Sequence, residues 1–116
     1  MAQTSNDIGN LLQIHSGVGV SDNDIVIQSS EVSRYDEFLL QSTAGAMDVF
    51  VSLDGTNYST AALSLIDLGA TTTAPVIVTA AGRTYGFFGA FMRIRVLQNG
   101  ATAVAGATLM CRPATT

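Results

Sequence analysis

The sequence has no lysine and no tryptophan, and it contains a single cysteine and a single histidine. One cysteine, Cys111, cannot form a disulfide within the chain. Cys111 and His15 together fall short of the cluster of Cys and His ligands that a structural zinc site requires. We therefore expect a fold that is held together by neither a disulfide nor a metal ion, and we expect no cofactor.

Charge is also scarce: charged residues make up 12% of the 116 residues, about half the usual share, whereas 47% are hydrophobic. A weakly charged surface promotes association, so we expect part of it to be buried against partner proteins. All five basic residues are arginines, and nine carboxylates give a net charge of -4. Nucleic-acid binding is not expected, because it requires a basic surface that neutralises phosphates.

Long apolar runs are missing as well, because none approaches the ~20 residues that span a bilayer. Residues 1–10 are polar and include Asp7, whereas a signal peptide would begin with basic residues and an apolar stretch. We expect no membrane association. The length fits one domain, which we place at residues 11–112, between a mobile N-terminal arm at 1–10 and a frayed C-terminus at 113–116.

Short apolar runs separated by turn residues are the main structural signal. They predict strands at 9–16, 25–28, 37–42, 47–53, 60–68, 76–79 and 90–97, and a last pair of segments at 102–104 and 108–111. Residues 17–24 have the composition of a loop. About seven or eight short strands and no secure helix predict an all-β fold, a two-sheet antiparallel β-sandwich or jelly roll.

Two turns have specific signatures. Residues 47–53 alternate and place four apolar side chains on one face, namely Met47, Val49, Val51 and Leu53. This strand ends at Asp54-Gly55, which predicts a tight turn and a hairpin that returns through Asn57-Tyr58. Asn99-Gly100 is the favoured pair for a two-residue type I′ turn, so we expect the strand at 90–97 to reverse there into residues 102–104.

Three segments together resemble a known family. These are residues 49–58 (VFVSLDGTNY), 85–88 (YGFF) and 92–96 (MRIRV), the last followed by Asn99-Gly100. Their order is similar to that in small β-sandwich proteins of tailed bacteriophages, notably capsid decoration or cement proteins. The similarity covers about half of the chain, and its motifs are turn and strand signatures.

The resemblance implies a virion protein that clamps neighbouring subunits of the major capsid protein as an oligomer, with an N-terminal extension reaching over the shell. Our leading hypothesis is a non-enzymatic decoration protein on the capsid outer surface, made in the host cytoplasm and assembled as a dimer or trimer. The alternative is a glycan- or receptor-binding module of a phage fibre or adhesin, although three tyrosines and no tryptophan offer little stacking surface.

Candidate catalytic and ligand-binding residues each have a simpler structural interpretation. His15 has no G-x-S-x-G nucleophile motif to serve, and Cys111 lies in an apolar run where a thiol is unreactive. Residues 22–24 (DND) lack the glycine and glutamate of an EF-hand loop. Asp36 and Glu37 are adjacent and would point to opposite sides of a strand. Residues 17–19 (GVG) do not open a helix as a phosphate-binding loop does.

We therefore predict no catalytic, metal or cofactor residues, and we look for an interface instead. Phe87, Phe88 and Phe91 lie within a short stretch together with Tyr85, and strand alternation should expose some of these rings. Arg93 and Arg95 share one face of a strand, where they could pair with carboxylates across the sheet or with acidic groups of a partner. These three phenylalanines and two arginines are the predicted interface residues.

Overall fold

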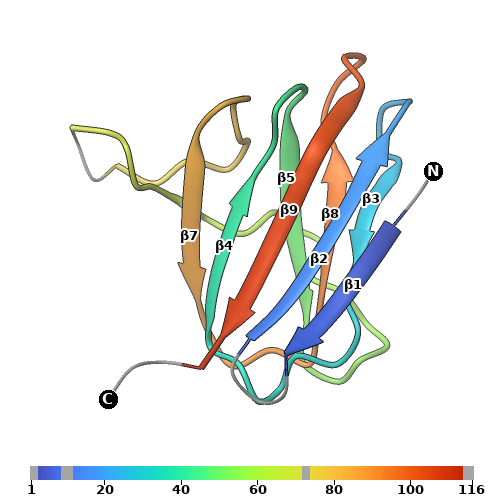
Figure 1. The fold of residues 1–116 in the computed structure, drawn as a ribbon, viewed down its shortest axis with the longest axis vertical. Coiled ribbons are helices and arrows are strands. Elements are labelled where there is room, and N and C mark those ends of the chain that lie inside the picture. Colours follow the sequence, from blue (N-terminus) through green and yellow to red (C-terminus); the bar gives the residue numbers. More distant parts are fainter. Residues whose placement is uncertain (1–2, 9–11, 72–73, 114–116) are drawn as a thin grey trace.

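A computed structural model describes residues 3–8, 12–71 and 74–113, with only the backbone of residues 3–8 described (Figure 1). Nine strands form two sheets in this part of the chain, and no helix there is long and apolar enough to cross a membrane. The strands are β1 Gln3–Ile8, β2 Leu12–Gly19, β3 Ile25–Gln28, β4 Glu37–Gln41, β5 Met47–Ser52, β6 Ile66–Asp67, β7 Thr84–Phe88, β8 Arg93–Gln98 and β9 Val104–Arg112.

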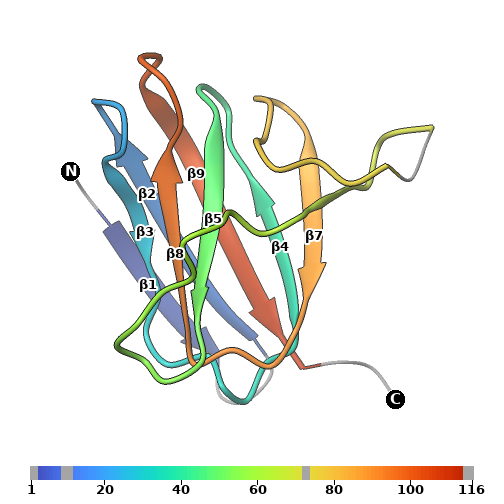
Figure 2. The same ribbon diagram turned by 180° about the vertical axis from the view of Figure 1, so that it is seen from behind.

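The two sheets stack as layers, with the larger sheet in front in Figure 1 and the smaller one in front in Figure 2. The larger sheet has the order β1-β2-β9-β4-β7-β6, and the smaller one has the order β3-β8-β5. All paired strands are antiparallel. Successive strands from β2 to β5, and again from β7 to β9, alternate between the two sheets. This alternation is typical of a jelly roll and confirms the predicted all-β, two-sheet fold.

Apolar side chains from both sheets meet between the layers. Burial alternates along β2, β4 and β8, so every second residue faces the core. The Phe38 ring is fully buried; its centre lies 5.1 Å from that of Phe87 and 5.8 Å from that of Phe91. Other large apolar side chains that are fully buried include Ile27, Tyr35, Leu40, Met47, Leu65, Ile94 and Leu109. Together they form one core.

The turn after β5 is confirmed. Asp54 Oδ1 accepts hydrogen bonds from the backbone N–H groups of Thr56 and Asn57, both at 2.8 Å, and Gly55 has φ +84°. These bonds hold the pKa of the Asp54 carboxyl well below its usual range, because they stabilise the charged form. Met47 and Val49 face the core as predicted. Leu53 is 73% exposed because the chain has already left the strand.

The predicted type I′ hairpin at Asn99-Gly100 is wrong, because β8 and β9 belong to different sheets. Gly100 has φ +102°, but Asn99 does not have the positive φ that this turn also requires. The buried Gln98 side chain shapes the connection instead. Its Nε2 donates to the Gly100 carbonyl at 2.9 Å, and its Oε1 accepts from the Val104 N–H at 3.3 Å. The loop thereby crosses between the layers.

Other segments also differ from their predictions. Residues 17–19 continue β2, because its bulged pairing with β9 extends through Gly17 and Gly19. Of residues 60–68, only Ile66–Asp67 forms a strand, and residues 76–79 contribute a single bridge between Val76 and Leu65. These segments have high β-propensity but little strand pairing, because they run irregularly past the edge of the small sheet.

The predicted N-terminal arm contains strand β1, because residues 3–8 pair with β2 along their whole length. Backbone pairing of this kind does not require apolar side chains, which is why composition alone gave no signal for it. The other residues of the arm that bear on the prediction, 1–2 and 9–10, lie outside the described residues. Of the C-terminus predicted to fray, residues 113–116, only Pro113 belongs to the described residues.

Candidate functional site

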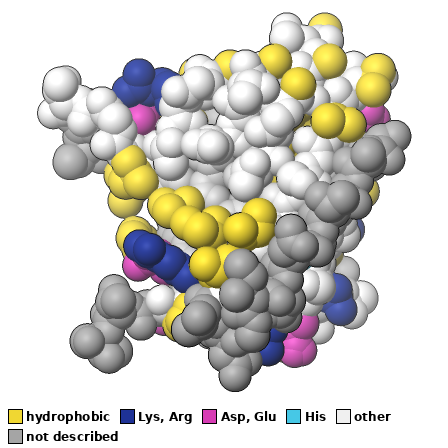
Figure 3. All heavy atoms as spheres, viewed as in Figure 1, with side chains coloured by type: hydrophobic (Ala, Val, Ile, Leu, Met, Phe, Trp, Pro, Cys, Tyr) yellow, Lys and Arg dark blue, Asp and Glu magenta, His cyan; other side chains and the backbone are white. Residues whose placement is uncertain are grey.

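The outer face of the six-stranded sheet has a line of apolar residues running across the strands. The register places Ile14 of β2 opposite Met110 of β9, Met110 opposite Leu39 of β4, and Leu39 opposite Gly86 of β7. Leu68 folds over Gly86, where an added Cβ would lie 3.6 Å from a Leu68 methyl carbon. We call Ile14, Met110, Leu39 and Leu68 the apolar row, and Figure 3 shows apolar side chains crossing the middle of this face.

Uncharged polar residues flank the apolar row on one side. Ser16, Thr108, Gln41 and Thr84 form the next line across the same strands. The Thr84 hydroxyl donates to Gln41 Oε1 at 3.1 Å. A hollow of about 240 Å³ lies between the two lines and is lined mainly by apolar atoms of Ile14, Leu39 and Met110. This part of the face therefore offers shape and apolar contact but no charge.

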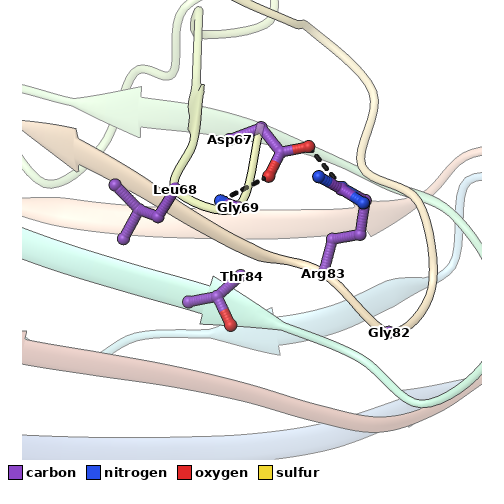
Figure 4. A pocket seen from close by; sticks show the side chains of 6 residues that line it. All are labelled: Asp67, Leu68, Gly69, Gly82, Arg83 and Thr84. Carbon is purple, nitrogen blue, oxygen red and sulfur yellow. Dashed lines mark hydrogen bonds and ion pairs between the residues drawn. The ribbon is translucent and has the colours of Figure 1, made fainter. Parts of the chain in front are cut away.

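Two ion pairs between described residues lie around this face. Arg112 of β9 forms an ion pair with Glu37 of β4, and Arg83 forms one with Asp67. The Arg83 guanidinium lowers the pKa of the Asp67 carboxyl, and the Asp67 carboxylate raises the pKa of Arg83. The second pair also occupies the hollow of about 400 Å³ beside β7, where Asp67 accepts from the Gly69 N–H as well (Figure 4). The charges of Arg83 and Asp67, which both line this hollow, therefore neutralise each other.

The predicted aromatic interface residues fall into different environments. Phe88 is 61% exposed beside the Arg112–Glu37 pair, on the same face as the apolar row. Phe87, in contrast, is only 3% exposed and stacks on Phe38, so its ring faces the core. Alternation along β7 turns the two neighbouring rings in opposite directions. Phe91 is partly buried and packs against the core.

Arg93 and Arg95 lie on the opposite layer, on the outer face of the three-stranded sheet. Arg95 Nε donates to Gln28 Oε1 at 2.9 Å, and Arg95 Cζ lies 4.0 Å from the centre of the Tyr58 ring. The predicted phenylalanine and arginine residues therefore do not form one continuous interface. They mark two faces that are separated by the core.

The remaining candidate residues have structural surroundings. Cys111 is fully buried, and burial raises the pKa of its thiol to about 12. Asp24 accepts from the backbone N–H groups of Val20 and Ser21, and Asp22 accepts from the Gly100 N–H at 2.8 Å, so both acids organise loops. Glu37 pairs with Arg112. No group of three or more potential metal ligands occurs among the described residues.

His15 points into the core from β2 and is completely buried. Its Nε2 donates to Gln13 Oε1 at 2.6 Å, which places a hydrogen on Nε2. Burial lowers the pKa of His15 below the model-compound value of 6.5, because the charged imidazolium loses its hydration. The environment favours a neutral histidine.

This shift predicts a pH-dependent stability. The unfolded chain binds a proton at His15 more readily than the folded chain, so stability is complete above pH 6.5 and falls as the pH drops through the lower folded pKa. We expect the thermal unfolding midpoint to fall more between pH 7.5 and 5.5 in the wild type than in His15→Gln, which keeps an amide donor for Gln13. An equal fall of the midpoint in the two proteins would show that titrating groups other than His15 cause the pH dependence.

Sequence reasoning missed the apolar row because a row depends on strand register. One signal was present: residues 37–40 (EFLL) and 109–111 (LMC) contain consecutive apolar residues, whereas a strand with one solvated face alternates. Leu39 and Met110 come from these runs, and both lie on the outer face. Consecutive apolar residues in these strands therefore indicated a face suited to being covered.

No protein-family model and no curated protein sequence matches the chain. Among solved structures, the SPBc2 prophage-derived protein YomS matches with a TM-score of 0.60 and 10% identity, covering 91% of this chain and 98% of YomS. Procruciferin, an 11S globulin from Brassica napus, matches with a TM-score of 0.47 and 11% identity, over 88% of this chain and 20% of procruciferin. The second likeness is too distant to bear on function, and the first shows that the chain shares its fold with a small prophage-derived protein.

Proposed function

We propose that the protein is a non-enzymatic structural protein of a tailed-phage virion, which self-associates and bridges major capsid protein subunits on the capsid outer surface. The observation that carries this proposal is the apolar row, which lies on a broad sheet face whose described charges are all paired. A face of this kind is suited to contact with another protein rather than to chemistry on a small substrate.

A second copy of the chain fits this face. Copies with a net charge of -4 repel one another, and a contact surface without net charge minimises that repulsion. From the usual strand spacing, the face covers roughly 500 Å² per copy, so a pair would bury about 1,000 Å², the lower limit for a specific interface. A two-fold contact would bring the apolar row of each copy against that of the other.

The likeness to YomS supports a phage origin, because a protein of nearly the same extent with this fold is encoded by a prophage. A small domain that binds a repeated lattice needs no strong single contact. Linked copies engage several capsid subunits at once, and the raised effective concentration increases occupancy. The shell then gains resistance because adjacent subunits are held together at each bridged site.

The direct test is to mix the purified protein with capsids from a panel of tailed phages and to measure bound copies per shell and shell heat resistance. We expect saturation at a copy number that matches the capsid symmetry, together with a shell that ruptures at a higher temperature. Failure to bind any capsid, combined with retention on a glycan array, would contradict the proposal and favour the fibre or adhesin alternative.

A further inference from the structure

Two neighbouring arginines on the outer face of the three-stranded sheet have no carboxylate partner among the described residues. Arg83 and Arg112 each form an ion pair, whereas Arg93 and Arg95 contact only neutral groups there. They are two residues apart on β8, so their side chains leave the sheet roughly 7 Å apart on the same side. Two like charges at this spacing disfavour each other unless an anion lies between them.

Arg95 is held in a fixed position by neutral neighbours. Its guanidinium lies over the Tyr58 ring, with Cζ 4.0 Å from the ring centre, and its Nε donates to Gln28 Oε1 at 2.9 Å. The same Gln28 amide donates from Nε2 to the Tyr58 hydroxyl at 2.5 Å. This network uses only the Nε donor, so the terminal nitrogens of Arg95 make no hydrogen bond to a described residue.

Arg93 stands beside Arg95 at the turn after β5. Its Nη1 donates to the Ser29 carbonyl at 3.4 Å, and a Cβ at Gly55 would lie 3.6 Å from its Nε. The two guanidiniums line a shallow hollow of about 390 Å³ together with Gln28, Gly55, Thr56 and Tyr58. We call this the arginine hollow.

Two acids on or next to β5, Asp54 and Asp48, accept hydrogen bonds from neutral groups. Besides its two backbone bonds, Asp54 accepts from the Ser52 hydroxyl at 3.1 Å and from Asn57 Nδ2 at 2.9 Å. Asp48 accepts from Asn99 Nδ2 at 3.2 Å. These hydrogen bonds come from neutral groups, and neither acid forms an ion pair with Arg93 or Arg95.

We propose that the arginine hollow binds carboxylates of an acidic segment of a partner protein, an inference that rests on the proposed function. Both terminal nitrogens of Arg95 and Nη2 of Arg93 make no hydrogen bond to a described residue, and guanidinium donors of this kind suit charge-assisted, bidentate recognition of carboxylates. Alternate residues of an extended segment are also roughly 7 Å apart, which matches the spacing of Arg93 and Arg95. A nucleic acid fits less well, because two arginines in a chain of net charge -4 neutralise little of a phosphate backbone.

This assignment gives the domain two different contacts on opposite layers. The apolar row would meet a second copy of the chain, and the arginine hollow would meet an acidic segment of the capsid protein. A domain with contacts on both layers can bridge two molecules without any change of shape. The partner segment is expected to carry acidic residues at alternate positions.

The probe is a short extended peptide with glutamate at two alternate positions, titrated at low salt and followed by NMR of the arginine Nε–Hε groups. We expect the signals of Arg93 and Arg95 to shift and those of Arg83 and Arg112 to stay. Replacing both residues, Arg93→Gln and Arg95→Gln, should weaken binding at least about tenfold, equivalent to ~1.4 kcal/mol. Raising the salt to 0.5 M should abolish it, because exposed charges are screened.

The matched control is the double variant Arg83→Gln and Arg112→Gln, which loses the same charge from the other sheet. An equal loss of peptide binding in the control would overturn the proposal, because the change in net charge alone would then explain the weaker binding. The conservative variant Arg95→Lys keeps the charge but loses the planar donors, so it should weaken binding partially. Full affinity in Arg95→Lys would argue against bidentate recognition.

Two further outcomes separate this inference from the proposed function. If inorganic phosphate or a sialylated sugar shifts the arginine signals and the glutamate peptide does not, the assignment to an acidic protein segment is wrong. If the wild type and the Arg93→Gln, Arg95→Gln variant bind capsids equally well, the proposal for the arginine hollow is wrong, whereas the proposed capsid role is supported. If the protein binds the peptide but no capsid, the proposal for the arginine hollow is supported and the proposed capsid role is contradicted.

Discussion

Phe38→Ala is expected to lower the free energy of unfolding by about 3–5 kcal/mol, the usual cost of removing a fully buried phenylalanine ring. Phe38 is 0% exposed and its ring contacts those of Phe87 and Phe91, so its removal breaks two aromatic contacts and leaves a cavity in the core. Urea denaturation of the two proteins, followed by circular dichroism, measures the difference.

Phe88→Ala is the matched control, because the same side-chain atoms are removed from a ring that is 61% exposed. Its cost should stay below about 1 kcal/mol, in the range of surface substitutions. Similar losses in the two variants would contradict the assignment of Phe38 to the core and of Phe88 to the surface. The comparison also tests the alternation along β7, which places Phe87 against Phe38 and turns Phe88 outward.

The strands that sequence analysis predicted well are those in which local pattern and pairing agree. The segment at 25–28 coincides with β3, and Ile94 and Val96 face the core as the alternation along β8 indicates. Segments with the same β-propensity failed where they meet a neighbouring segment only at isolated hydrogen bonds or a single bridge. Ile77 and Val78 are 53% and 40% exposed, although their β-branched run has the composition of a buried strand.

The interaction faces were harder to predict, because each depends on which strands lie side by side. Arg93 and Arg95 were correctly placed on one strand face, but only the three-dimensional structure shows Tyr58 and Gln28 beside Arg95. A turn signature also leaves the destination of the next strand open. The Asn99-Gly100 pair predicted a hairpin, whereas the buried Gln98 side chain helps direct the chain into the other sheet.

Leu39→Glu is expected to weaken self-association at least about a hundredfold, or about 2.8 kcal/mol. Leu39 lies at the centre of the apolar row, between Met110 and Gly86. In a two-fold contact each copy carries the substitution, so two carboxylates must lose their hydration in an apolar interface without a cationic partner. Light scattering across a concentration series measures the mass of each protein and hence the dissociation constant.

The matched control is Leu53→Glu, which makes the same replacement at a residue that is 73% exposed in the turn after β5. It adds the same charge, so it should leave the oligomer intact if the effect of Leu39→Glu arises in the interface. Thermal unfolding must show that both variants remain folded. A wild type that is monomeric at all concentrations, or a Leu39→Glu variant of unchanged mass, would contradict the assignment. If self-association raises capsid occupancy through avidity, Leu39→Glu should also reduce capsid binding.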